Sequence, residues 1–124
     1  MKIDGTTKTF EINFDPDIAI LEIKGRSTSE NPKLNYQVLL DTLEEYVRNP
    51  VPRTIVNLEI EYINSSSSRY MLTIFRLLED IHKAKKSQVD INWYYEEDDE
   101  VIISLGKDFK GIIEVPINLI EIVD

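Results

Sequence analysis

The chain has no cysteine, only four glycines and a single histidine among its 124 residues. Without cysteine it can form neither disulfides nor zinc–thiolate sites, and it has no thiol nucleophile. Gly25 and Gly106 stand alone, so no glycine-rich phosphate loop is present, which disfavours nucleotide binding of the P-loop or dinucleotide type. No apolar run approaches the roughly 20 residues that span a membrane, and the polar start lacks the apolar segment of a signal peptide. We therefore expect a cytoplasmic protein.

Positive charge is also scarce. The chain has 14 Lys and Arg against 23 Asp and Glu, which gives a formal net charge of −9. A surface of this sign repels phosphate backbones and anionic lipids, so we expect neither a nucleic acid nor a membrane as partner. The length is typical of one domain with its own buried core, and we interpret residues 1–124 as a single domain.

Apolar alternation predicts five strands. The first two, over residues 7–14 and 18–24, are joined by Asp15-Pro16-Asp17, a turn signal that favours an antiparallel hairpin. Further strands are predicted over residues 53–63, 89–95 and 112–122. Pro116 cannot donate to a sheet ladder, so it indicates an edge position or a bulge for the last of them.

Apolar residues at three- and four-residue spacing predict helices over residues 31–48, 66–86 and 101–109. Asn31-Pro32 is a favourable start for the first, and Asn49-Pro50 ends it. The resulting order is β-β-α-β-α-β-α-β. This pattern is typical of an α/β (α+β) fold with a mixed sheet of about five strands, and we expect the apolar strand at 53–63 at its centre.

Two features bear on catalysis. His82 lies near the end of the second predicted helix beside three lysines, which favours a solvated surface residue, and no Ser/His/Asp arrangement accompanies it. The acidic run at 96–100 could hold a hard cation and so serve a small metal-dependent enzyme. Its spacing is not that of a calcium loop, and acidic residues are common at helix starts. We assign no catalytic residue, no metal and no cofactor.

Trp93-Tyr94-Tyr95 lies on a predicted strand. Alternation sends Trp93 and Tyr95 to one face of the sheet and Tyr94 to the other. Most such aromatic residues pack in a core, although an exposed one could anchor a protein partner. Both interpretations stay open for this segment.

The run Asn64-Ser65-Ser66-Ser67-Ser68 lies where a strand passes into a helix. A serine there can cap the helix, as it would in a purely structural interaction subunit. The same position also suits a phosphate, because free backbone N–H groups and the helix dipole stabilise an anion. A phosphate brings about −1.5 to −2 charges and would oppose the docking of an apolar partner. The pattern alone leaves both the cap and the switch possible.

Four segments of the chain, in this order along it, carry a family resemblance: Gly25-Arg26-Ser27-Thr28-Ser29-Glu30-Asn31, Tyr62-Ile63-Asn64-Ser65-Ser66-Ser67, Trp93-Tyr94-Tyr95-Glu96 and Leu105-Gly106-Lys107-Asp108-Phe109. With them the chain resembles the SiaC family of bacterial regulatory phosphoproteins, whose members look like anti-sigma-factor antagonist (STAS) domains. The family pattern in the second segment is approximately Tyr-Leu-Asn-Thr-Ser-Ser, and its threonine is the regulatory phosphosite. This chain has Ser65 there.

The resemblance implies a non-enzymatic phosphoprotein that is phosphorylated on Ser65. Nearby Ser66, Ser67 and Ser68 are alternative acceptors. Asn64, Ser66 and Ser67 would form the loop that presents the acceptor. The earlier segment would contribute to the partner surface through Ser27, Glu30 and Asn31.

The resemblance also implies partners. A dedicated serine/threonine kinase would phosphorylate Ser65, and a PP2C-type phosphatase would reverse the reaction. The unphosphorylated form would bind a downstream target. In this family that target can be a diguanylate cyclase, which links the switch to cyclic di-GMP and biofilm formation.

Overall fold

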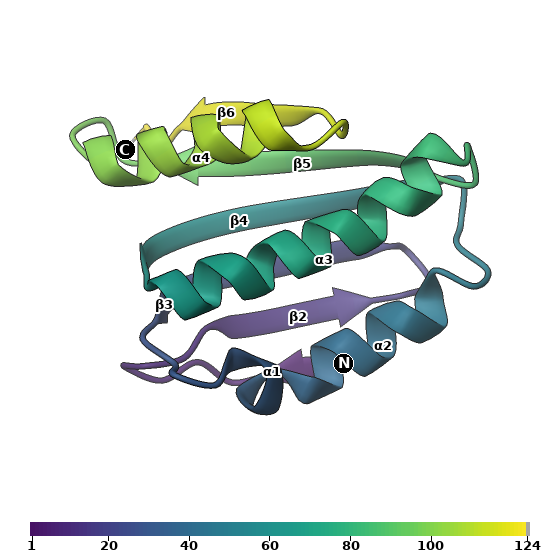
Figure 1. Cartoon of the computed structure of the whole chain (residues 1–124), viewed down its shortest axis with the longest axis horizontal. Helices are drawn as coiled ribbons and strands as arrows, with labels where there is room; N and C mark the ends of the chain where they lie inside the picture. Colours follow the sequence, from purple (N-terminus) through teal and green to yellow (C-terminus); the bar gives the residue numbers. More distant parts are fainter. Residues whose placement is uncertain (124) are drawn as a thin grey trace.

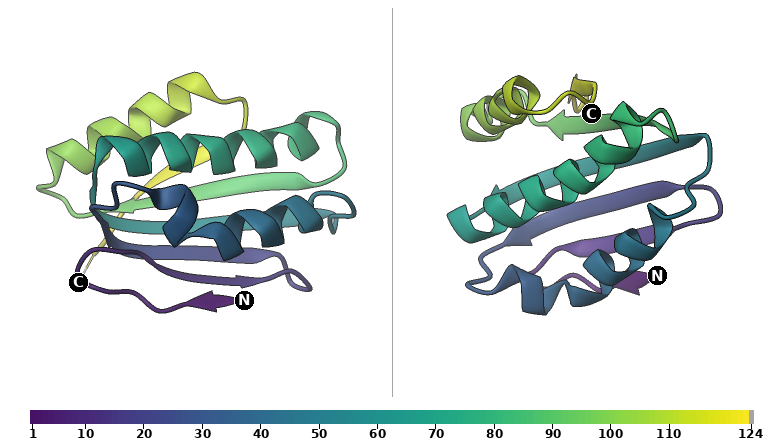
Figure 2. Two further views of the ribbon diagram at one scale, coloured as in Figure 1. Left: turned by 60° about the horizontal axis from the view of Figure 1, so that its bottom comes forward. Right: turned by 45° about the vertical axis from the view of Figure 1, so that its right-hand side comes forward.

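A computed structural model describes residues 1–123 of the chain and shows a six-stranded sheet with four helices, all on one face (Figures 1 and 2). The helices are α1 (Pro32–Asn35), α2 (Gln37–Tyr46), α3 (Ser65–Lys83) and α4 (Glu100–Ile112). The strands are β1 (Lys2–Ile3), β2 (Glu11–Asp15), β3 (Ile20–Ser27), β4 (Arg53–Ile63), β5 (Gln88–Tyr95) and β6 (Ile117–Glu121). The α/β class with a mixed sheet is confirmed, and the strand beyond the expected five is the two-residue β1.

The strands lie side by side in sequence order, from β1 at one edge to β6 at the other. The pairs β1–β2 and β2–β3 are antiparallel, which confirms the N-terminal hairpin. From β3 onward every pair is parallel, because a helix-containing connection returns the chain to the same end of the sheet each time. Strand β4 lies inside the sheet and β6 at its edge, as the apolar run at 53–63 and Pro116 predict.

The core lies between the sheet and the helices. Strand residues that face the helices are fully buried, among them Leu58 and Trp93, whereas Tyr94 on the next position is half-buried on the opposite face. That opposite face is polar. Asn92 donates from Nδ2 to Asn57 Oδ1 at 2.9 Å, and Asn118 donates to Asn92 Oδ1 at 3.1 Å. An antiparallel or mixed sheet can leave one face to solvent in this way.

None of the helices within residues 1–123 combines the length and apolar character needed to cross a bilayer.

Several predicted elements have different bounds in the structure: the strand predicted from residue 7 begins at Glu11, and the helix predicted to residue 86 ends at Lys83. Two further differences concern the first helix and the last strand. The first helix is divided at Tyr36, which is the C-cap of α1 and the N-cap of α2. The last strand begins at Ile117 instead of 112, because α4 continues to Ile112 and residues 113–116, with bends at 114 and 115, connect the helix to the strand. Both differences lie in segments whose apolar spacing fits either structure.

Strand β3 continues to Ser27, whereas the predicted strand ends at residue 24. Its register with β4 shifts between Gly25 and Arg26, and Gly25 has a φ of 96°. A residue without a Cβ tolerates this backbone conformation, which is typical of a bulge. The bulge carries the strand on to Ser27, whose side chain is buried beneath the start of α3.

Candidate phosphorylation and partner-binding site

Asn64 fixes the start of α3. Its side-chain oxygen accepts a hydrogen bond from the Ser67 backbone N–H at 2.9 Å, which makes Asn64 the N-cap. Its side-chain nitrogen donates to the Ser29 carbonyl at 3.0 Å, and its own backbone N–H donates to the Ser27 carbonyl at 3.0 Å. The cap is therefore Asn64, and the interpretation that a serine of this run caps the helix is wrong. None of the four serine side chains is therefore needed as the N-cap of α3.

The four serines that follow differ in accessibility. Ser65 is exposed, Ser66 and Ser68 are half-buried, and Ser67 has no exposed surface. The Ser67 hydroxyl lies 2.6 Å from the Ser27 hydroxyl in the interior. A kinase could reach Ser67 only if this part of the fold opened, whereas Ser65 is accessible in the folded protein.

Ser27 is not on the partner surface, contrary to the expectation from the sequence. Its side chain is 0% exposed and its hydroxyl lies 2.8 Å from the Tyr36 hydroxyl. The Tyr36 hydroxyl in turn accepts a hydrogen bond from the Phe10 backbone N–H at 3.0 Å. Together with Ser67, these groups form a buried hydroxyl chain that joins α3, β3 and the α1–α2 junction. Ser27 therefore supports the site from within.

Tyr70 adds a second tie between α3 and the α1–α2 junction. Its hydroxyl donates to the Tyr36 carbonyl at 2.9 Å. Burial, together with the negative electrostatic effect of Tyr36, raises the pKa of the Tyr70 hydroxyl well above its ordinary value, so it remains a donor over the physiological range. These ties hold the first turns of α3 in place around Ser65.

Glu30 and Asn31 are exposed, as expected for surface residues. The Asn31 side chain accepts from the Leu34 backbone N–H at 3.4 Å and so caps α1. Both residues line a groove of about 380 Å³ between α1 and α3, which Ser66 and Arg69 also line.

A larger groove of about 970 Å³ lies between the start of α3 and α4, and we call it the α3–α4 groove. Ser65 and Ser68 line it from α3. Its apolar lining residues are Tyr62, Ile63, Val101, Ile102 and Leu105. Tyr62 is 46% exposed and Val101 is 76% exposed, which is high for large apolar side chains. A protein partner that covered them would gain from removing this apolar surface from water.

The wall of the groove formed by α4 depends on Trp93 and Gly106. The Trp93 indole N–H donates to the Ile102 carbonyl at 3.0 Å, and Gly106 lets the helix approach the indole ring closely. This contact places Val101 and Leu105 opposite the start of α3. Neither residue belonged to the site expected from the sequence, because only the fold brings them near Ser65.

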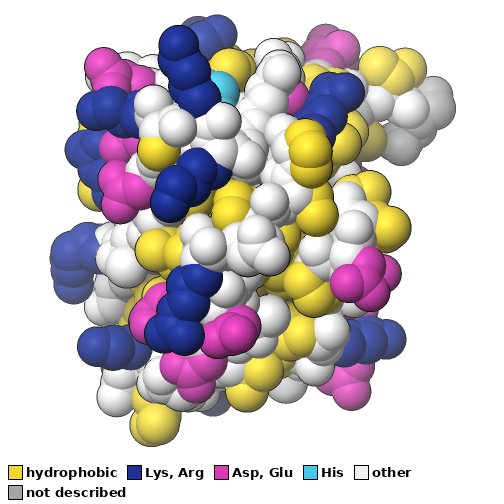
Figure 3. Space-filling view, turned by 90° about the vertical axis from the view of Figure 1, so that its right-hand side faces the viewer, with side chains coloured by type: hydrophobic (Ala, Val, Ile, Leu, Met, Phe, Trp, Pro, Cys, Tyr) yellow, Lys and Arg dark blue, Asp and Glu magenta, His cyan; other side chains and the backbone are white. Residues whose placement is uncertain are grey.

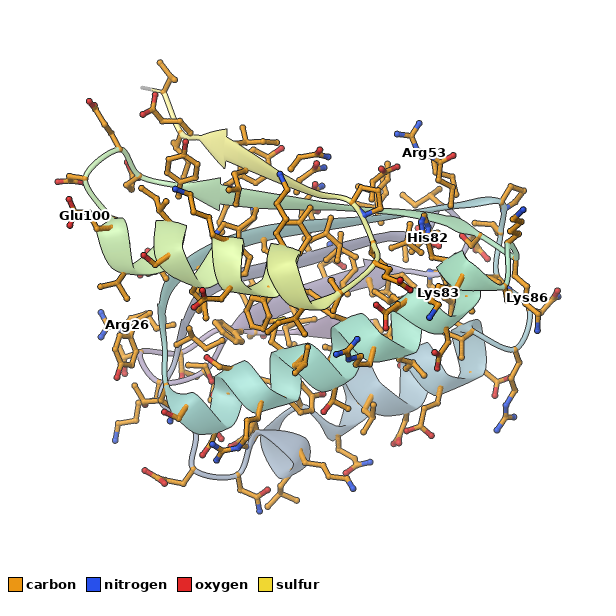
Figure 4. All side chains as sticks on the ribbon, turned by 45° about the horizontal axis from the view of Figure 1, so that its top comes forward. Arg26, Arg53, His82, Lys83, Lys86 and Glu100 are labelled. Carbon is orange, nitrogen blue, oxygen red and sulfur yellow. The ribbon has the colours of Figure 1, made fainter. Side chains whose placement is uncertain are left out.

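The charges around the groove are mostly negative. Four acidic residues line it: Glu61, Asp99, Glu100 and Asp108. Within residues 1–123, Arg69 is the one cationic residue that lines it, and its guanidinium lies 3.4 Å from the Ser66 hydroxyl. Arg26 lies nearby with its guanidinium carbon 5.6 Å from the centre of the Tyr62 ring, a cation–π distance. Figure 4 shows Arg26 and Glu100 at the same end of the sheet.

One residue of the acidic run at 96–100 caps a helix. Asp99 is the N-cap of α4, where its carboxylate accepts from the Ile102 backbone N–H at 3.1 Å. Within the described part of the chain, no group of three or more His, Asp or Glu residues is placed to hold a metal ion.

His82 lies at the other end of the sheet, with Arg53, Lys83 and Lys86 (Figure 4). It is half-buried, and its Nδ1 accepts a hydrogen bond from the Val89 backbone N–H at 3.0 Å. His82 lies at the surface as predicted but is only partly solvated, since its ring joins α3 to β5. Lysine and arginine side chains at this end are interspersed with acidic ones (Figure 3), so it presents no patch of one sign.

Comparisons with known proteins agree with this fold. The chain is 27% identical over 116 residues to the uncharacterized protein PA14_02130 of Pseudomonas aeruginosa strain UCBPP-PA14, covering 94% of this chain and 91% of that protein. It is similar to apo-SiaC from P. aeruginosa, with 26% identity, a TM-score of 0.87 and 97% of each chain covered. It is also similar to a chain in the crystal structure of the diguanylate cyclase SiaD in complex with its activator SiaC from P. aeruginosa, with 25% identity, a TM-score of 0.91 and coverage of 98% and 99%.

These similarities show that the molecule has the fold of SiaC over nearly the whole length of both chains. A family model for SiaC family regulatory phosphoproteins matches residues 3–122, which is nearly the whole chain. The chain belongs to the SiaC family of regulatory phosphoproteins, as the four sequence segments indicated.

Proposed function

We propose that this chain, acting as one regulatory domain, binds a target protein through the α3–α4 groove and releases it when Ser65 is phosphorylated. The observation that supports this most directly is the position of Ser65. It is the exposed serine of its run, and it lines a groove whose other side carries exposed Val101. An added group on Ser65 would therefore lie where a bound partner has to pack.

The modification would change both charge and volume at the groove. A kinase would transfer the γ-phosphoryl group of ATP to Ser65 Oγ, with loss of the hydroxyl proton and release of ADP. The product carries about −1.5 to −2 charges beside Asp99 and Glu100, which line the same groove. A partner packed on Tyr62 and Val101 would have to desolvate this anion, so its affinity would fall. A PP2C-type phosphatase would restore the binding form.

The target we propose is a diguanylate cyclase. SiaC of P. aeruginosa, whose structure this chain resembles, is the activator of such an enzyme. The groove has an apolar lining that includes exposed Tyr62 and Val101, so it fits a segment of the cyclase that presents apolar side chains. In this role the chain regulates an enzyme and catalyses no reaction itself. The cycle would run in the cytoplasm, where the kinase finds ATP.

The first experiment is phosphopeptide mass spectrometry on the protein isolated from its native host with phosphatases blocked. We expect phosphate on Ser65 in the wild type and none on the run in Ser65→Ala. Ser66→Ala is the matched control, because it removes a neighbouring hydroxyl from the same turn and should leave the modification in place. Phosphate that persists in Ser65→Ala and disappears in Ser66→Ala would refute the assignment.

The groove itself is tested by binding of the unphosphorylated protein to the host's diguanylate cyclase. Val101→Ala should weaken the complex by roughly tenfold, the effect of losing about 1–1.5 kcal/mol of apolar contact. Val123→Ala is the control, since Val123 is 82% exposed and does not line the groove. Equal effects of the two variants would exclude the α3–α4 groove as the docking surface.

A further inference from the structure

Arg69 is placed to meet a group attached to Ser65. It lies four residues later on α3, and residues at that spacing are neighbours on a helix surface. Its side chain is exposed and already reaches back toward the helix start, where its guanidinium lies 3.4 Å from Ser66 Oγ. Ser65 and Arg69 also line the same groove. The guanidinium therefore has donors close to the place where a phosphate on Ser65 would lie.

Arg69 is a cation in surroundings that are otherwise mostly negative. The acidic side chains that line it would repel a phosphate and raise its second pKa; they are Glu61, Asp99, Glu100 and Asp108. Arg26, the other arginine at this end, is held over the Tyr62 ring. The neighbouring groove between α1 and α3 is lined by Glu30 and Lys33, whose opposite charges largely cancel. Among these groups, Arg69 is the cation on the same helix face as Ser65.

We propose that Arg69 is the intramolecular partner of the phosphate on Ser65. On phosphorylation the guanidinium exchanges the weak Ser66 contact for a charge-assisted pair with the phosphate oxygens, a geometry that its planar fork favours. The pair holds the phosphate against α3 at the edge of the groove, although the acidic residues would otherwise drive it into solvent. It also removes from the groove the one cation that lines it within residues 1–123. This assignment rests on the proposed function for its biological role.

The test measures the second pKa of the phosphate directly. Phosphoserine is incorporated at position 65 during protein synthesis by genetic code expansion, and the phosphate is titrated by ³¹P NMR in the full-length protein. That pKa is ordinarily about 6. Arg69→Gln should raise it by about 0.5 pH unit, because a neighbouring positive charge is lost. Arg69→Lys should raise it less, since the charge is kept without the fork.

Arg26→Gln is the control, because it removes an arginine at the same end of the molecule that is held over Tyr62. It should move the phosphate pKa by less than half as much as Arg69→Gln. An unchanged titration in Arg69→Gln, or a larger shift in Arg26→Gln, would overturn the assignment. The phosphate is installed without a kinase, so this result is independent of whether the host modifies Ser65, which the phosphopeptide measurement decides.

Discussion

Replacing Asn64 by alanine should destabilise the protein by about 2 kcal/mol. Loss of an asparagine N-cap costs about 1 kcal/mol, and here the Ser67 N–H would lose its acceptor. The second bond of the same side chain, from Nδ2 to the Ser29 carbonyl, contributes about 1 kcal/mol more. With a urea dependence of about 1–3 kcal/mol/M, the midpoint of urea-induced unfolding should fall by about 1 M, measured by circular dichroism.

Ser65→Ala is the matched substitution one residue away. Ser65 is exposed, and its hydroxyl makes no hydrogen bond within residues 1–123 of the structure, so the change in stability should stay within about 0.5 kcal/mol. The reasoning fails if Asn64→Ala unfolds at the same urea concentration as the wild type while Ser65→Ala lowers the free energy of unfolding by about 1 kcal/mol, since the cap would then belong to the serine. The comparison thus separates a structural role of Ser65 from a regulatory one.

Two further predictions concern the stability of the fold, one through Gly106 on α4 and one through Glu79 on α3. A Cβ at Gly106 would lie 2.7 Å from the Trp93 indole, so Gly106→Ala should lower the free energy of unfolding by about 1–2 kcal/mol, after the gain in helix propensity is subtracted, and should alter Trp93 fluorescence. Gly111 has open space around it, so Gly111→Ala should leave the fluorescence unchanged and the stability at or above that of the wild type. The Glu114 backbone N–H lies 2.6 Å from the Glu79 carboxylate and is the main cause that holds the pKa of Glu79 below its ordinary range. A depressed folded-state pKa stabilises the fold above the unfolded value of about 4.3 and less as pH falls below it, so the stability difference between wild type and Glu79→Gln should be largest at pH 7 and shrink by pH 3. A pH-independent difference would contradict this explanation.

The order of the elements could be predicted from the sequence because each strand and helix has a clear apolar period. The turn at Asp15-Pro16-Asp17 predicts the hairpin, and Pro116 predicts the edge position of β6, although it lies one residue before that strand. The break at Tyr36 could not be predicted, because Tyr36 fits the apolar stripe of one continuous helix. What divides the helix is tertiary: the Tyr36 hydroxyl is held by Ser27 and by the Phe10 N–H.

The serine pattern alone leaves four candidate acceptors, and the family resemblance is what favours Ser65 among them. The spacing of a short serine run does not show which hydroxyl points inward, and that choice depends on β3 extending past Gly25 to bring Ser27 beneath α3. The same limit applies to the partner surface. Val101 follows an acidic run and reads as an ordinary helix residue, and only the packing of α4 on Trp93 brings it opposite Ser65.

Capping by Asn64 has a consequence for the cellular lifetime of the protein. Because the hydrogen bonds that start α3 do not involve the Ser65 hydroxyl, a phosphate added there breaks none of them, and the cap is the same in both forms. Proteases act mainly on unfolded molecules, so phosphorylation would not speed degradation through loss of this cap. Under the proposed function, the ratio of the two forms would follow the balance of kinase and phosphatase.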